Sequence, residues 1–145
     1  MWRKRMQYVF GTLCSLEAYG DDIQAISDAL EAGVNQIERV ERLLNPFNPK
    51  SRISWLNQEA SKYPVKVDAE LYAILVALRR LSERTDGKFD LTVWPLVQLW
   101  RSCDKAGCYP SEDVLSETVE SIGYSKVQLD ALRQTVWFMD DRVAV

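Results

Sequence analysis

One stretch of the chain, residues 85–100, places aromatic, carboxylate and hydroxyl side chains close together. Phe89 stands between Lys88 and Asp90, and an Asp-x-Thr sequence then leads into an apolar segment interrupted by Pro95. Surface loops rarely carry so many apolar residues, because a buried loop must satisfy every backbone polar group that it removes from water. We therefore predict that this segment packs around another group instead of extending into solvent.

The residue types in the chain exclude several kinds of site. There is no histidine, which excludes Ser-His-Asp and Cys-His nucleophile systems and the usual zinc ligand sets. The cysteines are Cys14, Cys103 and Cys108. Cys103 and Cys108 could pair, or bind a metal together with a partner chain, whereas most free cysteines are inert or structural. A net charge of −3 without a basic stripe gives no support for nucleic-acid binding.

Two long helices are expected to position these residues. Apolar residues recur at helical spacing over residues 23–44, after a capping Asp22, and again after Asp68 in a helix that ends at Gly87. The other predicted elements are short helices over residues 53–60 and 111–121 and strands over residues 8–19, 65–67, 126–129 and 134–139. Gly11-Thr12 interrupts the first strand, which indicates a bulge or a close approach to the backbone.

These elements predict an α+β fold, in which an antiparallel sheet packs against long amphipathic helices in one domain covering residues 1–145. The strand over residues 134–139 is rich in β-forming side chains and is followed by only a few residues. We expect it to present an uncovered edge that favours pairing with other chains. No long apolar run follows the basic first residues, so we expect no signal peptide, no membrane span and a cytoplasmic protein.

Four segments form an ordered set: Phe10-Gly11-Thr12, residues 42–57, residues 85–100 and residues 122–127. The first resembles the opening Met-Gly-Thr of the FAD:protein FMN transferase family, also called the thiamine-biosynthesis lipoprotein family. The second resembles the family's Pro-x-Ser-Glu-(Ile/Leu)-Ser-x-Leu-Asn stretch. The third is similar to Thr-Asp-Gly-Ala-Phe-Asp-x-Thr-Val followed by Pro-Leu, and the fourth to Val-Gly-Tyr-x-Lys-Val. Together the segments span nearly the whole chain.

The resemblance implies an enzyme that uses Mg²⁺ to transfer FMN from its substrate FAD to a threonine hydroxyl of an acceptor protein. It also implies FAD-contacting positions at Phe10, Phe47, Lys88, Phe89 and Asp90. Phe47 stands where the family places an aromatic residue against the flavin ring, a contact that stacking stabilises; alternatively, it is a loop aromatic that fills the core. Asp90 could accept hydrogen bonds from an adenine or a ribose, or it could cap the following turn.

Several positions depart from the family pattern. Arg52 stands where Glu is usual, Trp55 where Arg is common, and Trp94 where a Gly precedes Pro95. The bulk of Trp94 could fill space beside the ligand-binding loop. The family's Asp-Leu-Gly-Gly-Ile-Ala-Lys-Gly motif and its metal ligands are expected beyond Val145. We therefore identify no catalytic residue and no metal ligand in this sequence.

Two functions remain open from the sequence. The first is the N-terminal portion of an FAD:protein FMN transferase, truncated relative to the full family fold, with a flavin-acceptor protein as its partner. The second is a non-catalytic remnant or interaction module, or one half of a split enzyme that a separately encoded C-terminal half completes. Full-length members of the family are often exported, whereas this sequence by itself predicts a cytoplasmic location.

Overall fold

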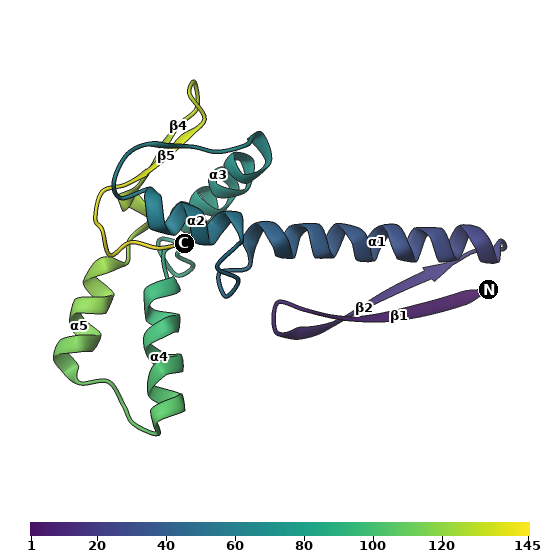
Figure 1. The fold of residues 1–145 in the computed structure, drawn as a ribbon, viewed down its shortest axis with the longest axis horizontal. Helices are drawn as coiled ribbons and strands as arrows, with labels where there is room; N and C mark the ends of the chain where they lie inside the picture. The colour runs from purple at the N-terminus through teal and green to yellow at the C-terminus, as the bar shows by residue number, and fades with distance from the viewer. The chain divides into compact units, whose positions relative to one another are not determined.

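The computed structural model describes all residues of the chain, 1–145, which divide into two compact units (Figure 1). The first unit is Met1–Trp55 and the second is Leu56–Val145. Both combine helices with antiparallel strands, so the predicted α+β class is confirmed. No helix has the length and the apolar character needed to cross a membrane.

The first unit begins with a hairpin of β1 (Trp2–Val9) and β2 (Thr12–Tyr19). Val9 pairs with Thr12, so Phe10 and Gly11 alone form the turn, with φ values of 52° and 74°. A two-residue turn with both φ values positive matches the right-handed twist of the flanking strands. The prediction of one bulged strand over residues 8–19 was wrong, because a phenylalanine with positive φ is uncommon and masked the turn.

The helix α1 (Ile23–Leu44) runs beside this hairpin, as Figure 1 shows, and matches the predicted bounds. The Asp22 carboxylate caps it by accepting a hydrogen bond from the backbone N–H of Gln24 at 2.8 Å. Its buried residues Ile26, Leu30 and Val34 recur at helical spacing. Gly33 allows close packing, because a Cβ atom there would lie only 2.5 Å from Leu16 Cδ2 in β2.

The helix α2 (Arg52–Glu59) contains the boundary between the two units. The second unit then adds β3 (Val65–Lys66) and α3 (Ala69–Arg84), which Asp68 caps by accepting a hydrogen bond from Leu71 N–H at 2.9 Å. The remaining strands are β4 (Val127–Asp130) and β5 (Thr135–Phe138). The core of the unit is apolar, and its most buried members include Val65, Leu71, Leu75, Val127, Val136 and Phe138.

The expected uncovered edge at residues 134–139 was wrong. The order of the sheet is β3-β5-β4, so β5 is its central strand and has an antiparallel partner on each side. The sequence did not show that the brief strand at Val65 would pair with Val136. The following residues are also fixed in place, since Val143 is 2% exposed and Val145 N–H donates to Asn57 Oδ1 at 2.9 Å.

A further helix, α4 (Trp94–Ala106), occupies the segment that the sequence suggested was broken by Pro95. Pro95 lies in the first turn of α4, where a missing backbone N–H costs no hydrogen bond and the fixed φ favours the helix. The helix α5 (Glu112–Ser121) follows, capped by Ser111 within the predicted range. Before α4, α3 ends at Arg84 rather than at Gly87, and a short 3-10 helix, η1 (Tyr124–Lys126), precedes β4.

Candidate functional site

The first candidate site residue, Phe10, lies in the hairpin turn of the first unit, and its side chain is 38% exposed. Its backbone N–H donates a hydrogen bond to Glu41 Oε1 at 3.0 Å. Glu41 belongs to the last turns of α1, and Figure 1 shows the turn of the hairpin beside that end of the helix. The carboxylate therefore fixes the turn that carries Phe10 to the C-terminal part of α1.

The second candidate, Phe47, belongs to the loop that follows α1 and is 53% exposed. Its backbone N–H donates to Asn45 Oδ1 at 2.9 Å, and Asn45 Nδ2 in turn donates to Glu41 Oε1 at 3.4 Å. Glu41 thus accepts hydrogen bonds from both aromatic segments. The structure brings Phe10 and Phe47 to one end of α1 and leaves about half of the Phe47 ring exposed, so Phe47 does not fill the core.

The other three candidates, Lys88, Phe89 and Asp90, lie in the second unit, in the loop after α3. Thr85 organises this loop, because its Oγ1 accepts a hydrogen bond from Phe89 N–H at 3.1 Å and its carbonyl accepts one from Lys88 N–H at 3.1 Å. Asp86 and Gly87 make the reversal with φ values of 53° and 75°. The side chains of Lys88 and Phe89 are exposed at the surface of this loop.

Asp90 forms hydrogen bonds within the segment over residues 85–100 and to the segment over residues 122–127. Its Oδ1 accepts hydrogen bonds from the Thr92 N–H at 2.8 Å and the Thr92 hydroxyl at 2.6 Å, and its Oδ2 accepts one from Tyr124 N–H at 2.9 Å. The buried Thr92 Oγ1 accepts a further bond from Gly123 N–H at 2.7 Å. Asp90 therefore caps the following turn and also fixes a second loop, while its contact with FAD stays a prediction.

Two departures from the family pattern contact each other within the first unit. The guanidinium carbon of Arg52 lies 4.5 Å from the centroid of the Trp55 ring, the distance of a cation–π interaction. An arginine in place of Glu and a tryptophan in place of Arg therefore form a pair that neither substitution would give alone. The third departure, Trp94, begins α4 and is partly buried.

The acidic and cysteine side chains are spread over the chain without forming a cluster of metal ligands. No group of three or more Asp, Glu or Cys residues is arranged to hold a metal ion. Mg²⁺ prefers a near-octahedral set of oxygen ligands. The structure therefore assigns no residue of this chain as a magnesium ligand.

Three residues that the sequence did not identify as site residues position the candidates. Glu41, Thr85 and Thr92 were not singled out, although Thr85 and Thr92 stand inside the family-like stretch. The Asp-x-Thr spacing was the available signal for the Asp90 turn, since a carboxylate commonly bonds to the backbone two residues on. No local signal connects Glu41 to Phe10, because the two residues are 31 positions apart.

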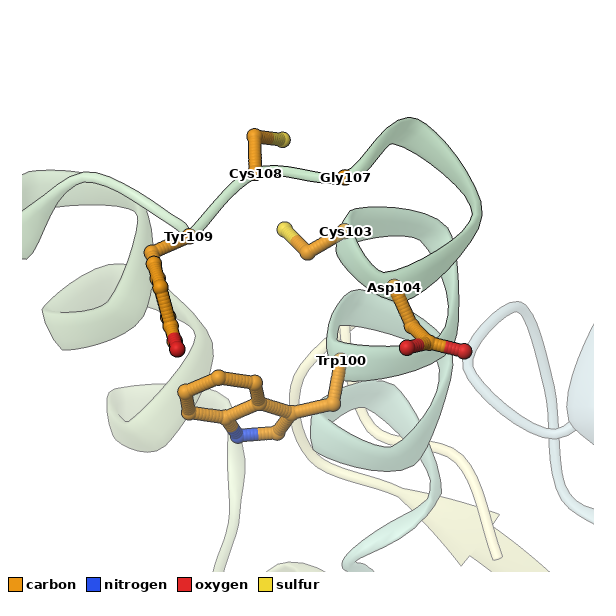
Figure 2. A pocket seen from close by; sticks show the side chains of 6 residues that line it. All are labelled: Trp100, Cys103, Asp104, Gly107, Cys108 and Tyr109. Carbon is orange, nitrogen blue, oxygen red and sulfur yellow. The ribbon is translucent and has the colours of Figure 1, made fainter.

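A surface pocket of about 250 Å³ lies elsewhere in the second unit (Figure 2). It is lined by residues from the end of α4 and the segment that follows: Trp100, Cys103, Asp104, Gly107, Cys108 and Tyr109. None of the five candidate site residues contributes to it. The lining combines the two thiols of Cys103 and Cys108 with the aromatic rings of Trp100 and Tyr109.

Comparisons with known proteins agree on one family. The model of the ApbE family matches residues 10–145. The FAD:protein FMN transferase of Treponema pallidum is 30% identical over 128 residues, which are 88% of this chain and 35% of that protein. The FAD:protein FMN transferase of Chlamydia trachomatis is 29% identical over 113 residues, 75% of this chain and 36% of that protein.

Solved structures show the same fold. The ApbE protein of Thermotoga maritima superposes with a TM-score of 0.90 at 23% identity, covering 100% of this chain and 47% of that one. The flavin transferase ApbE of Vibrio cholerae gives a TM-score of 0.83 at 21% identity, with 100% and 47% coverage. The chain therefore spans about a third of the length of these curated relatives and about half of the solved chains.

Proposed function

Since this chain belongs to the ApbE family, we propose that it supplies the flavin-contacting part of an FAD:protein FMN transferase. The reaction moves FMN from FAD to a threonine hydroxyl of an acceptor protein and depends on Mg²⁺. It forms a phosphoester bond between the threonine oxygen and the FMN phosphate. The phosphoanhydride bond to the AMP part breaks, AMP leaves, and the hydroxyl proton passes to a base.

The placement of two aromatic rings carries the proposal. Phe10 and Phe47 are joined through Glu41 and Asn45 at one end of α1, and both rings are at least partly exposed. Burying exposed aromatic surface against a flat flavin ring is favourable, and the fixed backbone lowers the ordering cost on binding. Within the second unit, and independently of these rings, Lys88, Phe89 and Asp90 are proposed as FAD-contacting residues, on a loop whose backbone is hydrogen-bonded to Thr85 and Asp90.

The magnesium-dependent step of the proposed reaction is not assigned to residues of this chain. Phosphoryl transfer rests mainly on positioning and on stabilising the charge of the transferred group. Because no three acidic or cysteine residues are grouped to hold a metal ion, we assign no step of the transfer to Mg²⁺ in this chain. We propose that a polypeptide equivalent to the unmatched part of the relatives is required as a partner for activity.

A fluorescence titration with FAD tests the binding role. The flavin emission is expected to change on adding the protein, and Phe47→Ala is expected to weaken the affinity about fivefold through the loss of one stacking contact. Tyr19→Ala is the matched control, because Tyr19 is an 80% exposed aromatic residue at the opposite end of the hairpin. No response of the wild-type protein at high micromolar FAD, or equal losses in both variants, would contradict the binding role.

A labelling assay tests the transferase role. The chain is incubated with FAD, Mg²⁺ and a threonine-containing acceptor protein, and flavin fluorescence of the acceptor is read in a gel. Labelling is expected only when a polypeptide carrying the rest of the family's sequence is added. Labelling by the chain alone would show that it contains a complete transfer site.

A further inference from the structure

The helix α4 ends in a turn that places two cysteines next to each other. Gly107 adopts the left-handed conformation, with φ 65° and ψ 32°, and its N–H donates to the carbonyl of Asp104 at 3.2 Å. The N–H of Cys108 donates to the carbonyl of Cys103 at 3.1 Å. These two hydrogen bonds define a Schellman motif, in which Cys103 and Cys108 hold the two positions whose side chains normally make an apolar contact.

The geometry of this motif suits a covalent bond between the two sulfurs. Figure 2 shows the Cys103 sulfur pointing toward the segment that carries Cys108. A disulfide requires Cα atoms within about 7 Å of each other. A backbone hydrogen bond of 3.1 Å joins the two residues and keeps their Cα atoms near enough to meet this requirement.

The surroundings give the two thiols different roles. Cys103 is 8% exposed, and its burial, followed by the effect of Cys108, raises the pKa of the Cys103 thiol. Cys108 is exposed and forms the upper edge of the pocket in Figure 2. Below it the rings of Trp100 and Tyr109 meet edge to face, with centroids 6.5 Å apart. An oxidant therefore reaches Cys108 first, and Cys103 is positioned to attack afterwards.

We propose that Cys103 and Cys108 are a thiol-oxidation site that forms a reversible intramolecular disulfide with a low-molecular-weight disulfide as oxidant. The Cys108 thiolate attacks the small disulfide, forms a mixed disulfide and releases one small thiol. The Cys103 thiolate then attacks the Cys108 sulfur and releases the second small thiol. The protein loses two protons and two electrons, and the small disulfide gains them as two thiols.

Intact-mass measurement in glutathione buffers of graded potential tests the pair. In oxidised glutathione, the wild-type chain and Cys14→Ser are expected to lose the mass of two hydrogens, with residues 103 and 108 linked in one peptide. Cys103→Ser is expected to retain a glutathione adduct on Cys108, because the second step is blocked. A stable adduct on the wild-type chain, unreacted thiols, or a disulfide that includes Cys14 would overturn the proposal.

Gly107→Ala tests whether the turn is responsible. An added Cβ at Gly107 would meet no atom within 4 Å, so the substitution strains only the backbone at positive φ. In the reduced variant, position 107 is free to leave the left-handed region, whereas the disulfide holds it there, so the equilibrium constant for forming the disulfide is expected to fall about fivefold, the ratio that corresponds to the lower end of the left-handed penalty. An unchanged constant would show that the turn does not bring the two thiols together. Gly11→Ala is the control, since Gly11 also has positive φ and open space but lies in the β1–β2 turn.

Discussion

The backbone N–H of Phe10 donates a hydrogen bond to the carboxylate of Glu41, at a distance of 3.0 Å. The bond joins the tip of a hairpin to the end of a long helix. It also holds in place a turn whose first residue is a phenylalanine with a φ of 52°, a conformation that few residues other than glycine and asparagine adopt readily. A single acidic side chain therefore positions both aromatic segments of the first unit.

Removing that side chain should loosen both segments. Glu41→Ala is expected to lower the free energy of unfolding by about 1 kcal/mol, the usual net worth of such hydrogen bonds, and to weaken the FAD response. Urea denaturation and the FAD titration measure the two effects. Glu41→Gln retains an acceptor oxygen and should be close to wild type, as should Glu31→Ala on the exposed surface of α1. If Glu41→Ala matches Glu31→Ala in both measurements, the carboxylate does not position the aromatic segments.

The buried hydroxyl of Thr92 should matter more to stability. Thr92→Val is expected to lower the free energy of unfolding by about 1–3 kcal/mol, because it leaves Gly123 N–H without its acceptor and removes a donor to Asp90. Thr118→Val is the matched control, because the Thr118 hydroxyl bonds only to the Val114 carbonyl of its own helix. Equal denaturation midpoints for the two variants would show that the link between the two loops contributes little.

The stability of the second unit should fall in acid. Arg142 donates hydrogen bonds from its side chain and its backbone N–H to Asp140, and these, with a weaker effect of Lys126, hold the pKa of the Asp140 carboxyl well below its usual range. A carboxyl whose pKa is lower in the folded state stabilises the fold above the ordinary value of 3.8. This contribution is lost progressively as the pH drops below that value.

Thermal unfolding of Asp140→Asn across this pH range checks the contribution. The variant is expected to be less stable than wild type near pH 7, with a difference that shrinks below about pH 4, the ordinary range for a carboxyl. Asp141→Asn, the neighbouring position, serves as the control. A difference that stays constant from neutral to acid pH would show that ionisation of Asp140 does not stabilise the fold.

Oxidation of the cysteine pair should stabilise the end of α4. Closing the loop between Cys103 and Cys108 is expected to raise the free energy of unfolding by about 2 kcal/mol in the chain-entropy model for so short a loop. Unfolding of the oxidised and reduced wild-type chain in urea measures the difference, and the Cys103→Ser variant should show none. A less stable oxidised form would indicate that the bond strains the turn.

The sequence predicted the elements whose signals are local. The 22 residues of α1 were recovered with both ends, because Asp22 caps the helix and the apolar residues keep one period throughout. The family resemblance also followed from contiguous motifs, and the match over residues 10–145 confirms it. Pro95 was interpreted as a break in the apolar segment, although proline also favours the first turn of a helix. Only the residues after Pro95 show whether a helix begins there.

The features that were missed depend on residues far apart in the chain. Val65 of β3 pairs with Val136 of β5. A strand of two residues has too short a hydrophobic pattern to predict which strand it pairs with. The Phe10–Gly11 turn was read as a bulge because its first residue is not a usual turn former. For the site, the sequence named Asp90, but its bonds to Thr92 and Tyr124 required the second loop to be placed beside it.

The close contact of Gly33 with Leu16 fixes the position of the hairpin along α1. An α-helix turns by about 100° and rises about 1.5 Å for each residue. Deleting one residue between Gly33 and Glu41 would therefore keep the contact of the hairpin with Gly33. It would rotate the Glu41 carboxylate by about 100° around the helix axis, away from the Phe10 turn. Substitutions on the exposed side of this interval should be tolerated, whereas insertions and deletions should not. The number of residues in that part of the helix, more than their identity, sets where the two aromatic rings stand.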